Sequence, residues 1–321
     1  MQTCLFKADK NTYKANLHCH TTVSDGALTP EQVKEAYKSK GYSIVAFSDH
    51  RAMIPHPGLN DENFLALNAC EVDFAQNLPG ESWEKAKTYH LNLLATGPEM
   101  TRTPPLPAME YGDTDALNEY VKARTDEGFL VNYNHPYWSL QDFRDYGGLK
   151  GCFAVEIYNH GCEADGLYGY NPEVYDEMLR AGSRLFCLST DDNHNGRWHG
   201  GPMDDSFGGF VVINAESLKY ETIIGALKRG DFYASQGPEI YEISIKAATN
   251  AMANAAEKNK VYVRCSPAAI IALCTDGRRR VLKRGAGICE AEFELAGDEK
   301  YIRVLCRDKD GKDANSNAYW L

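Results

Sequence analysis

The sequence predicts an α/β protein in which a parallel, barrel-like sheet wrapped by helices precedes a small antiparallel β-sandwich. Short apolar runs alternate with helical stretches from residue 13 to about residue 235, as in a parallel sheet covered by helices. Motifs of histidine and carboxylate follow several of these runs, which places them at strand ends. Beyond Gly237 and Pro238 the chain changes to short strands separated by polar or glycine-containing turns.

The first predicted helix has the clearest end signals. Thr29 is suited to the N-cap, Gln32 completes a capping box and Gly41 ends the helix. A strand at 43–50 follows at once. The chain therefore begins with the strand, helix and strand of a parallel unit.

The same alternation continues and predicts seven or more strands in the first part of the chain. We expect helices near 114–127, 139–149 and 172–181, strands at 129–136, 152–159, 184–192 and 208–215, and a last helix capped by Ser217 and ending near Arg229. Residues 96–113 hold four prolines and are predicted to form a surface crossover or an active-site lid. The segments 160–172 and 195–208 are candidate substrate loops because they are rich in Gly, Asn and His.

The C-terminal part is predicted to be a separate β-sandwich. Its strands are expected at 240–246, 260–265, 269–275, 290–295 and 301–307, followed by a hairpin whose terminal aromatic residues contact the body of the protein. We divide the chain into a barrel at 1–238 and an accessory domain at 239–321. The accessory domain carries no cluster of ligand residues, so we expect it to stabilise the barrel or to form a homo-oligomer.

Composition restricts the classes of function. The 321 residues include 34 Lys and Arg against 45 Asp and Glu, and the resulting net charge of -11 disfavours an extended nucleic-acid interface. The ten cysteines are scattered without a C-x-x-C pair, and the N-terminus has no apolar signal region. No stretch approaches the roughly 18 apolar residues that span a membrane. We expect a cytoplasmic protein with reduced thiols and no membrane partner.

Six of the nine histidines lie beside small acidic motifs at predicted strand ends. In chain order the motifs are His18-Cys19-His20, Ser24-Asp25-Gly26, Ser48-Asp49-His50, Glu71, His90, Asn134-His135-Pro136 and Asp191-Asp192-Asn193-His194. Strand ends of a parallel α/β barrel converge on the active-site face. Residues two apart on a strand point the same way, so His18 and His20 can bind one ion, and so can Asp192 and His194. Cys19 is then a packing residue.

The order of these motifs resembles the PHP (polymerase and histidinol phosphatase) superfamily of metal-dependent hydrolases, over residues 13 to about 235. With the D-D-N-H motif at 191–194 and the tail N-S-N-A-Y-W-L at 315–321, it is most similar to the carbaryl-hydrolase-type branch. The resemblance implies a distorted seven-stranded β/α barrel with a trinuclear metal site. The implied ligands are His18, His20, Glu71 and Asp192 for a first ion, Glu71 with His90 and His135 for a second, and Asp25, His50 and His194 for a third.

Two or three divalent ions are therefore expected as cofactors. Many relatives have histidine where this chain has Asp25, and a carboxylate there favours manganese or iron slightly over zinc. Two cations sharing Glu71 would lower the pKa of a bridging water and present hydroxide to a phosphoryl centre, while the third would neutralise the leaving oxygen. The predicted function is hydrolysis of a small phosphoester.

Three alternatives compete with phosphoester hydrolysis. A carboxylester or carbamate hydrolase would use the same metal site, and an aromatic-lined pocket would favour it; the aromatic residues near the motifs are Tyr137, Trp138, Tyr158, Tyr168, Tyr170 and Trp198. A nuclease would need a basic groove that the net charge does not indicate. A non-catalytic binding module would be expected to have lost several of the nine ligand positions.

Further residues receive roles by their position. Arg197 and His199 could bind a phosphate oxygen and protonate the leaving group, or lie in a plain surface loop. Residues predicted to orient ligands or substrate are Glu156, Asn159, Asp49 and Asn134. Residues predicted to be structural or ordinary are Asp191, His56 and His160, and Arg51 is a weak candidate for phosphate binding.

Overall fold

The computed structural model describes residues 2–196, 201, 203–248, 258–278 and 280–321. Its α-helices are α1 (Pro30–Ser39), α2 (Thr114–Asp126), α3 (Phe143–Tyr146), α4 (His160–Gly166), α5 (Pro172–Arg180) and α6 (Tyr220–Arg229), with short 3-10 helices at Pro57–Leu59 and Trp83–Lys85. None of the helices in these ranges is long and apolar enough to cross a membrane. All ten cysteine thiols are free.

The strands form one continuous mixed sheet. They are β1 (Gln2–Lys7), β2 (Asn11–Asn16), β3 (Ile44–Phe47), β4 (Leu65–Ala75), β5 (Thr88–Ala95), β6 (Phe129–Tyr133), β7 (Ala154–Asn159), β8 (Phe186–Thr190), β9 (Phe210–Ala215), β10 (Phe232–Ser235), β11 (Ile240–Lys246), β12 (Lys260–Thr275), β13 (Val281–Glu294), β14 (Tyr301–Arg307), β15 (Asp313–Ser316) and β16 (Tyr319–Trp320). Their order is β1-β11-β12-β14-β15-β10-β9-β2-β3-β4-β5-β6-β7-β8, with β13 paired to β12 and β16 to β14. The α/β class is as predicted.

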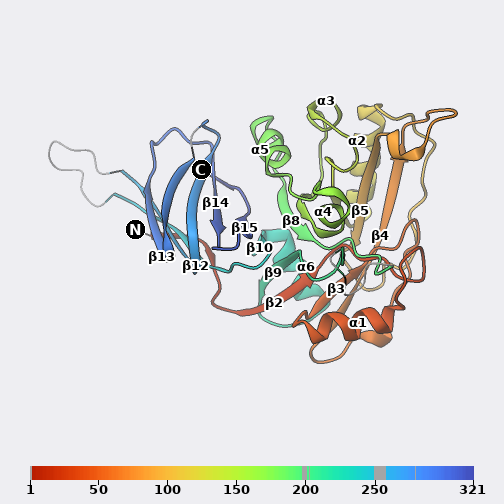
Figure 1. Cartoon of the computed structure of the whole chain (residues 1–321), viewed down its shortest axis with the longest axis horizontal. Coiled ribbons are helices and arrows are strands. Elements are labelled where there is room, and N and C mark those ends of the chain that lie inside the picture. The colour runs from red at the N-terminus through yellow and green to blue at the C-terminus, as the bar shows by residue number, and fades with distance from the viewer. Residues whose placement is uncertain (1, 197–200, 202, 249–257, 279) are drawn as a thin grey trace.

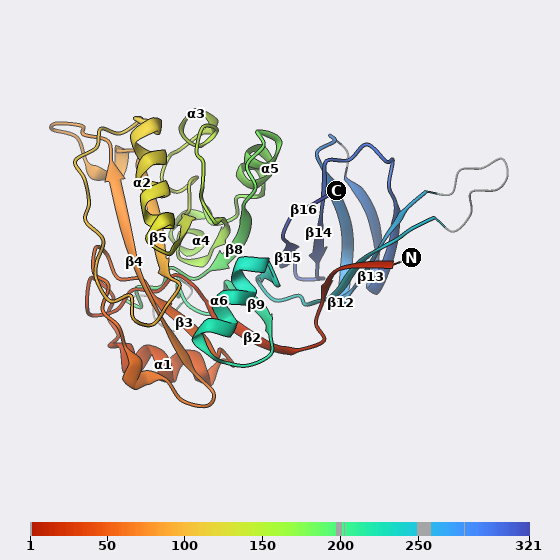
Figure 2. The same ribbon diagram turned by 180° about the vertical axis from the view of Figure 1, so that it is seen from behind.

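The helices and β2–β8 make up one side of the molecule, and β11–β14 make up the other (Figures 1 and 2). In the first side, β2, β3 and β4 are parallel, as are β6, β7 and β8. Between these groups β5 runs antiparallel to both of its neighbours. The prediction of an all-parallel arrangement is therefore wrong for β5, and its N-terminal end lies at the edge where the other strands have their C-terminal ends.

The predicted distorted seven-stranded barrel is not confirmed, because the sheet is not closed and stays open between β2 and β8. The second edge of β2 is occupied by the antiparallel strand β9, and a strand has only two edges. Contact between the ends of β2 and β8 is made by an isolated bridge between Cys19 and Asn193 and by the buried Asn16 side chain, whose Oδ1 accepts from the Asp191 backbone N–H at 3.0 Å. The C-terminal ends of β2 and β8, which lead into His18 and Asp192, are nevertheless held together.

The predicted C-terminal sandwich is not confirmed, because the C-terminal strands continue the same sheet. β15 pairs with β10, and β1, at the opposite end of the chain, pairs with β11. The two strands predicted at 260–265 and 269–275 are one long strand, β12, whose pairing with β13 shifts between Arg264 and Ala268. Of the tail residues predicted to contact the body, Trp320 packs against the apolar cluster of the first side, whereas Leu321 is 54% exposed. The Ala318 N–H also donates to the Tyr175 hydroxyl at 3.0 Å.

The helix ends show which local signals were sufficient. The capping box of α1 is confirmed, with Thr29 and Gln32 bonded to each other's backbone N–H. Ser217 does not cap α6, which begins at Tyr220, and its hydroxyl bonds to Thr222 instead. The helix predicted at 139–149 is only the four-residue α3, which begins after a capping Asp142.

The interior of β4 positions the site. Its alternate residues Leu65, Leu67 and Ala69 belong to a buried apolar cluster with residues of β2 and β3. Glu71 is the next residue of this face, because side chains two apart on a strand share a face. Glu71 is thus 1% exposed, next to this buried apolar face.

Candidate metal centre

The structure brings all nine predicted ligand residues together at one edge of the sheet. His18 and His20 follow β2, His50 follows β3, Glu71 lies within β4, His90 within β5, His135 follows β6, Asp192 and His194 follow β8, and Asp25 lies in the turn after His20. These nine residues form three groups whose ligand atoms lie within 4.8 Å of one another, and a fourth group joins His18 and His135 to Glu156. The reversed direction of β5 is what brings His90, its third residue, to this edge.

Glu71 is the centre of the cluster. Asn134 Nδ2 donates to its Oε1 at 2.8 Å, which is the predicted orienting hydrogen bond. The ring nitrogens of five histidines surround the same carboxylate: His90 Nδ1 at 3.1 Å, His50 Nδ1 at 3.2 Å, His20 Nε2 at 3.3 Å, and His18 Nε2 and His135 Nε2 at 3.4 Å. One carboxylate can therefore share ions with histidines on either side.

A second carboxylate, Asp192, completes the most buried group. Its Oδ1 lies 3.0 Å from both His18 Nε2 and His20 Nε2, and these two nitrogens are 3.1 Å apart. His18 Nδ1 lies 2.8 Å from Glu156 Oε1, so a proton on Nδ1 leaves the Nε2 lone pair directed into the group. His18, His20, Glu71 and Asp192 thus form one set of converging N and O atoms.

Two atoms of this centre have no hydrogen-bond partner although they are buried. They are Asp192 Oδ1 and His20 Nδ1. Buried polar atoms are normally paired, because leaving them unpaired costs about 1–3 kcal/mol. A divalent cation would supply the missing partner, and imidazole nitrogen with carboxylate oxygen is a suitable donor set for zinc, manganese or iron. The residues present therefore fit a bound metal.

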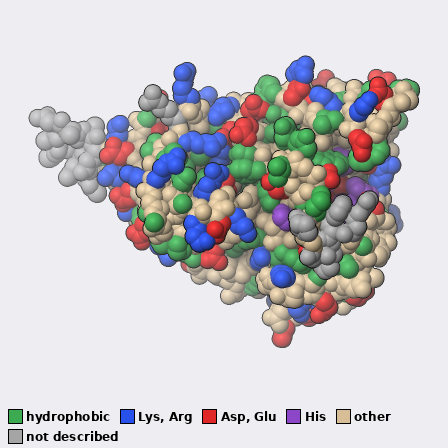
Figure 3. Space-filling view, viewed as in Figure 1, with side chains coloured by type: hydrophobic (Ala, Val, Ile, Leu, Met, Phe, Trp, Pro, Cys, Tyr) green, Lys and Arg blue, Asp and Glu red, His purple; other side chains and the backbone are tan. Residues whose placement is uncertain are grey.

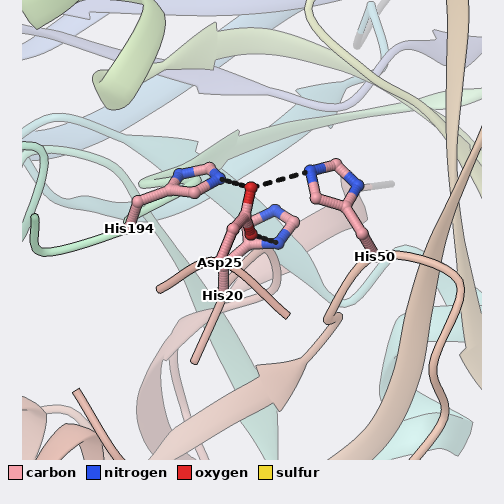
Figure 4. Close-up of side chains that lie close together, drawn as sticks. All are labelled: His20, Asp25, His50 and His194. Atoms are coloured by element: carbon pink, nitrogen blue, oxygen red, sulfur yellow. Dashed lines mark ion pairs between the residues drawn. The ribbon is translucent and has the colours of Figure 1, made fainter. Parts of the chain in front are cut away.

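The third group lies nearer to solvent. Figure 4 shows Asp25 directed between His194 and His50, with His20 below. Asp25 Oδ2 lies 3.5 Å from His194 Nε2 and 3.7 Å from His50 Nε2, and Oδ1 lies 3.6 Å from His20 Nδ1. The Asp25 side chain is 53% exposed, whereas that of His20 is fully buried. His20 faces two groups with its two ring nitrogens, and the prediction had assigned it to only one.

The electrostatics of the centre favour cations. Burial lowers the pKa of His18 and His20, but the Asp192 and Glu71 carboxylates outweigh burial, raising the pKa of His18 well above its usual value and that of His20 to about 9. Burial raises the pKa of Glu71, but the neighbouring histidines His18 and His90 dominate and hold it well below its usual value. The negative field that attracts a proton to these imidazoles attracts a metal cation in the same way.

Polar residues around the centre hold its ligands in place. Glu156 is 1% exposed, and besides His18 it accepts from Thr190 Oγ1 at 2.7 Å and from the His135 backbone N–H at 3.1 Å. Asn159 Nδ2 donates to Asp192 Oδ2 at 3.1 Å. The hydrogen bonds described for Asp49 come from the backbone and hydroxyls of Thr21 and Ser24, which fixes the turn that carries Asp25.

The backbone at two ligands is left-handed, which corrects one part of the sequence argument. Asp192 has φ 52° and His135 has φ 20°, conformations that are rare for residues other than glycine and that are often found at functional sites. β8 ends at Thr190, so strand alternation does not explain how Asp192 and His194 are aimed. Asp192 and His194 both reach the centre, but Asp192 belongs to the buried group and His194 to the group of Asp25.

Asp191 is structural, as predicted, and the sequence did not reveal a second structural carboxylate. Asp191 is fully buried and accepts backbone N–H groups from Phe207, Gly208 and Gly209. Asp205 accepts from the His194 backbone N–H at 2.7 Å and so fixes that ligand. It lies in the polar loop 195–208, where no local pattern distinguishes it from its neighbours.

The remaining predicted residues are less closely connected to the centre. Arg197, His199 and Trp198 lie outside the described residues. Arg51 is paired with Asp73 through two bonds of 2.8 and 2.9 Å. His56 packs its ring against Phe47, and His160 bonds to the Tyr158 hydroxyl.

The comparisons with known proteins found similarity in structure alone. No family model matches the chain, and no curated protein matches it. A two-domain protein from Bacteroides vulgatus containing a predicted PHP-like metal-dependent phosphoesterase is 13% identical with a TM-score of 0.47, covering 99% of this chain and 98% of its own.

Two further solved structures match a smaller share of the chain. A proposed metal-dependent phosphoesterase from Bifidobacterium adolescentis is 15% identical with a TM-score of 0.37, covering 58% of this chain and 89% of its own. An amidohydrolase from Chromobacterium violaceum with bound sulfate is 16% identical with a TM-score of 0.33, covering 56% of this chain and 87% of its own. Since all three TM-scores lie below 0.5, the function has to be inferred from this chain's own side chains.

Proposed function

We propose that this chain is a metal-dependent hydrolase of the PHP type that cleaves a small phosphoester. The observation that carries the proposal is the convergence of six histidines and three carboxylates in overlapping groups that share Glu71 and His20. Structural zinc sites usually take four ligands rich in cysteine. Here Cys19, between His18 and His20 in the chain, belongs to an apolar cluster with Val33 and Tyr37, and the converging atoms are nitrogen and oxygen.

Each group has a distinct place in the proposed centre. His18, His20, Glu71 and Asp192 would hold one ion, Glu71 with His90 and His135 a second, and Asp25 with His50, His194 and His20 a third. Such ions lower the pKa of water toward neutrality and offset negative charge on the ester being cleaved. The oxygen ligands, including Asp25, favour manganese or iron slightly over zinc.

The protein's own residues would position and shield this chemistry. Glu156 holds His18 with one ring nitrogen directed inward, and Asn134 fixes the rotation of the Glu71 carboxylate. The buried group excludes bulk water, since His18, His20 and Glu71 are at most 1% exposed. Asp25, with half of its side chain exposed, lies on the side from which a substrate would approach.

Hydrolysis of a carboxylester or carbamate is the second candidate, and one observation favours it. Among the described residues, no lysine or arginine forms an ion pair with Glu71, Asp25 or Asp192. Cationic side chains commonly bind phosphate oxygens, and a neutral ester does not need them. The edge of Trp138 against His135, with ring centroids 5.3 Å apart, gives this side of the centre an apolar surface that suits a neutral ester.

One parallel assay distinguishes the two candidates. The protein would be stripped of metal, reloaded separately with manganese, iron and zinc, and assayed against a phosphomonoester, a phosphodiester, a carboxylester and a carbamate. We expect phosphoester hydrolysis that depends on metal and is lost in His20→Ala. Turnover of the carboxylester or carbamate alone would replace the first proposal with the second, and metal binding without any turnover would contradict both.

A further inference from the structure

Large apolar side chains are exposed around the mouth of the metal centre. Trp83 is 72% exposed, Tyr137 53%, Leu167 79% and Tyr168 42%. They come from three separate connections, after β4, after β6 and after α4. Apolar side chains gather beside the visible histidines on the face drawn in Figure 3. Exposed apolar groups that gather beside a polar site commonly mark a ligand-binding surface.

Trp138 connects these side chains to the candidate ligands. Its ring meets His135 edge-on with centroids 5.3 Å apart and His90 with centroids 6.1 Å apart. Its indole N–H donates to Asp165 Oδ2 at 2.9 Å, which fixes the ring, and Trp83 lies 6.4 Å away on the outer side. An aromatic surface therefore runs without interruption from the histidines to solvent.

Tyr137, Tyr168 and Leu167 form the other part of this surface. The rings of Tyr137 and Tyr168 are in contact, with centroids 5.2 Å apart. Leu167 is left-handed, with φ 64° and ψ 32°, at the C-cap of α4. Glycine is the usual residue at such a position, because a left-handed conformation is unfavourable for residues with a Cβ. Leu167 is therefore a left-handed residue whose side chain is 79% exposed, so burial of that side chain does not offset the unfavourable conformation.

We propose that Trp83, Tyr137, Trp138, Leu167 and Tyr168, here called the apolar rim, bind an aromatic group of the substrate next to the bond that is cleaved. The inference rests on the proposed hydrolase and names its substrate class, an aryl or arylmethyl ester. Flat aromatic groups bind well against aromatic rings in stacked or edge-on arrangements. Within the rim, Trp138 lies directly beside His135 and His90, so an aromatic group bound against it is adjacent to the candidate ligands.

Binding of non-hydrolysable analogues tests the proposal without turnover. The manganese-loaded full chain would be titrated by calorimetry with 1-naphthylmethylphosphonate, methylphosphonate and 1-naphthalenemethanol. We expect the naphthyl phosphonate to bind at least tenfold more tightly than methylphosphonate. The double variant Tyr137→Ala with Tyr168→Ala should lose that ratio and keep both its metal content and its affinity for methylphosphonate.

Leucine variants provide a matched control. Leu167→Ala should weaken binding of the naphthyl phosphonate severalfold, whereas Leu282→Ala, at a 41% exposed leucine of β13, should not change it. Equal affinities for the two phosphonates, or a ratio that the rim variants leave unchanged, would overturn the proposal. If neither phosphonate binds but naphthalenemethanol binds in a way that depends on Tyr137 and Tyr168, the rim stands and the phosphoester assignment fails.

Discussion

The two sides of the molecule both bury charged groups, but they treat them differently. In the C-terminal side, Arg303 is fully buried and its Nε donates to Asp176 Oδ1 at 2.8 Å, while its Nη1 donates to Asn315. Arg307 forms two bonds to Asp313. In the side that carries β2–β8, the buried Asp192 Oδ1 instead faces two histidine nitrogens at 3.0 Å, and among the described residues no lysine or arginine pairs with it.

The difference separates a structural use of buried charge from a functional one. A buried ion pair in which each charge has a partner of opposite sign holds elements together, and Arg303 joins β14 to α5 in this way. A buried cluster of imidazole nitrogens and carboxylate oxygens consists of acceptors, so it needs protons or cations from solution to become fully paired. The four groups able to hold an ion all come from residues 18–194 of the described chain.

The largest expected effect is the loss of activity when a shared ligand is removed. We predict that His20→Ala and Asp192→Asn each lower turnover by roughly two orders of magnitude or more, because they remove atoms of the buried group that would activate water. Turnover and bound metal would be measured by steady-state assay and elemental analysis. His56→Ala, a histidine outside the four groups, is the control and should retain both. Near wild-type turnover of His20→Ala at saturating metal would contradict the assignment.

The structural use of charge predicts the next effect, on stability. Asp176→Ala should lower the free energy of unfolding by about 3–5 kcal/mol, because it leaves Arg303 buried without its counter-charge. Arg280, whose Nη2 also donates to Asp176, would lose a partner as well. Urea denaturation measures the change, and metal content per folded molecule should stay the same. Arg307→Ala, at a pair whose arginine side chain is 40% exposed, should have a clearly smaller effect. Equal losses of stability in the two variants would show that the buried pair of Arg303 and Asp176 is no more important for the fold than the partly exposed pair of Arg307 and Asp313.

The ligand residues could be predicted from the sequence because they follow apolar strands in recognisable motifs. The direction of each strand was not predicted, because an apolar run such as 91–95 has the same pattern in either direction. One signal was available: the connection between β4 and β5 has no helical periodicity, and parallel strands need a long crossover, usually a helix. That connection indicates an antiparallel pair, which explains how His90 reaches Glu71.

Contacts between distant segments were also beyond the sequence pattern. Nothing near Gln2–Lys7 indicates that this strand pairs with β11, more than two hundred residues away. The open edge between β2 and β8 depends on β9 occupying β2, and this choice is made by packing, not by local propensity. Asp205 was missed for the same reason, because its role is to hold the backbone of His194 within a folded loop.

The third prediction concerns a residue that acts through a ligand. Glu156→Gln should weaken metal binding about 10–100-fold, because glutamine keeps the shape but provides a poorer acceptor for the His18 Nδ1 proton. Competition with a metal-binding dye measures the affinity of the folded protein. The midpoint of unfolding without metal should fall as well, because Glu156 also accepts from Thr190 Oγ1 and the His135 backbone N–H. Glu163→Gln, whose carboxylate accepts only the Gly169 backbone N–H among the bonds described, is the matched control. An unchanged metal affinity would mean that Glu156 supports the fold and not the centre.

The smallest expected effect has opposite signs on the two sides of the molecule. Leu167→Gly should raise the free energy of unfolding by about 0.5–1 kcal/mol, because glycine adopts the left-handed C-cap of α4 without strain. Leu282→Gly should lower it by a similar amount, because Leu282 lies in β13, paired with Ala272, and glycine weakens a strand interior. Chemical denaturation of the two variants side by side measures both changes. Destabilisation by Leu167→Gly would show that Leu167 contributes to the fold of the free protein, which would remove the argument that its exposed side chain is kept for binding.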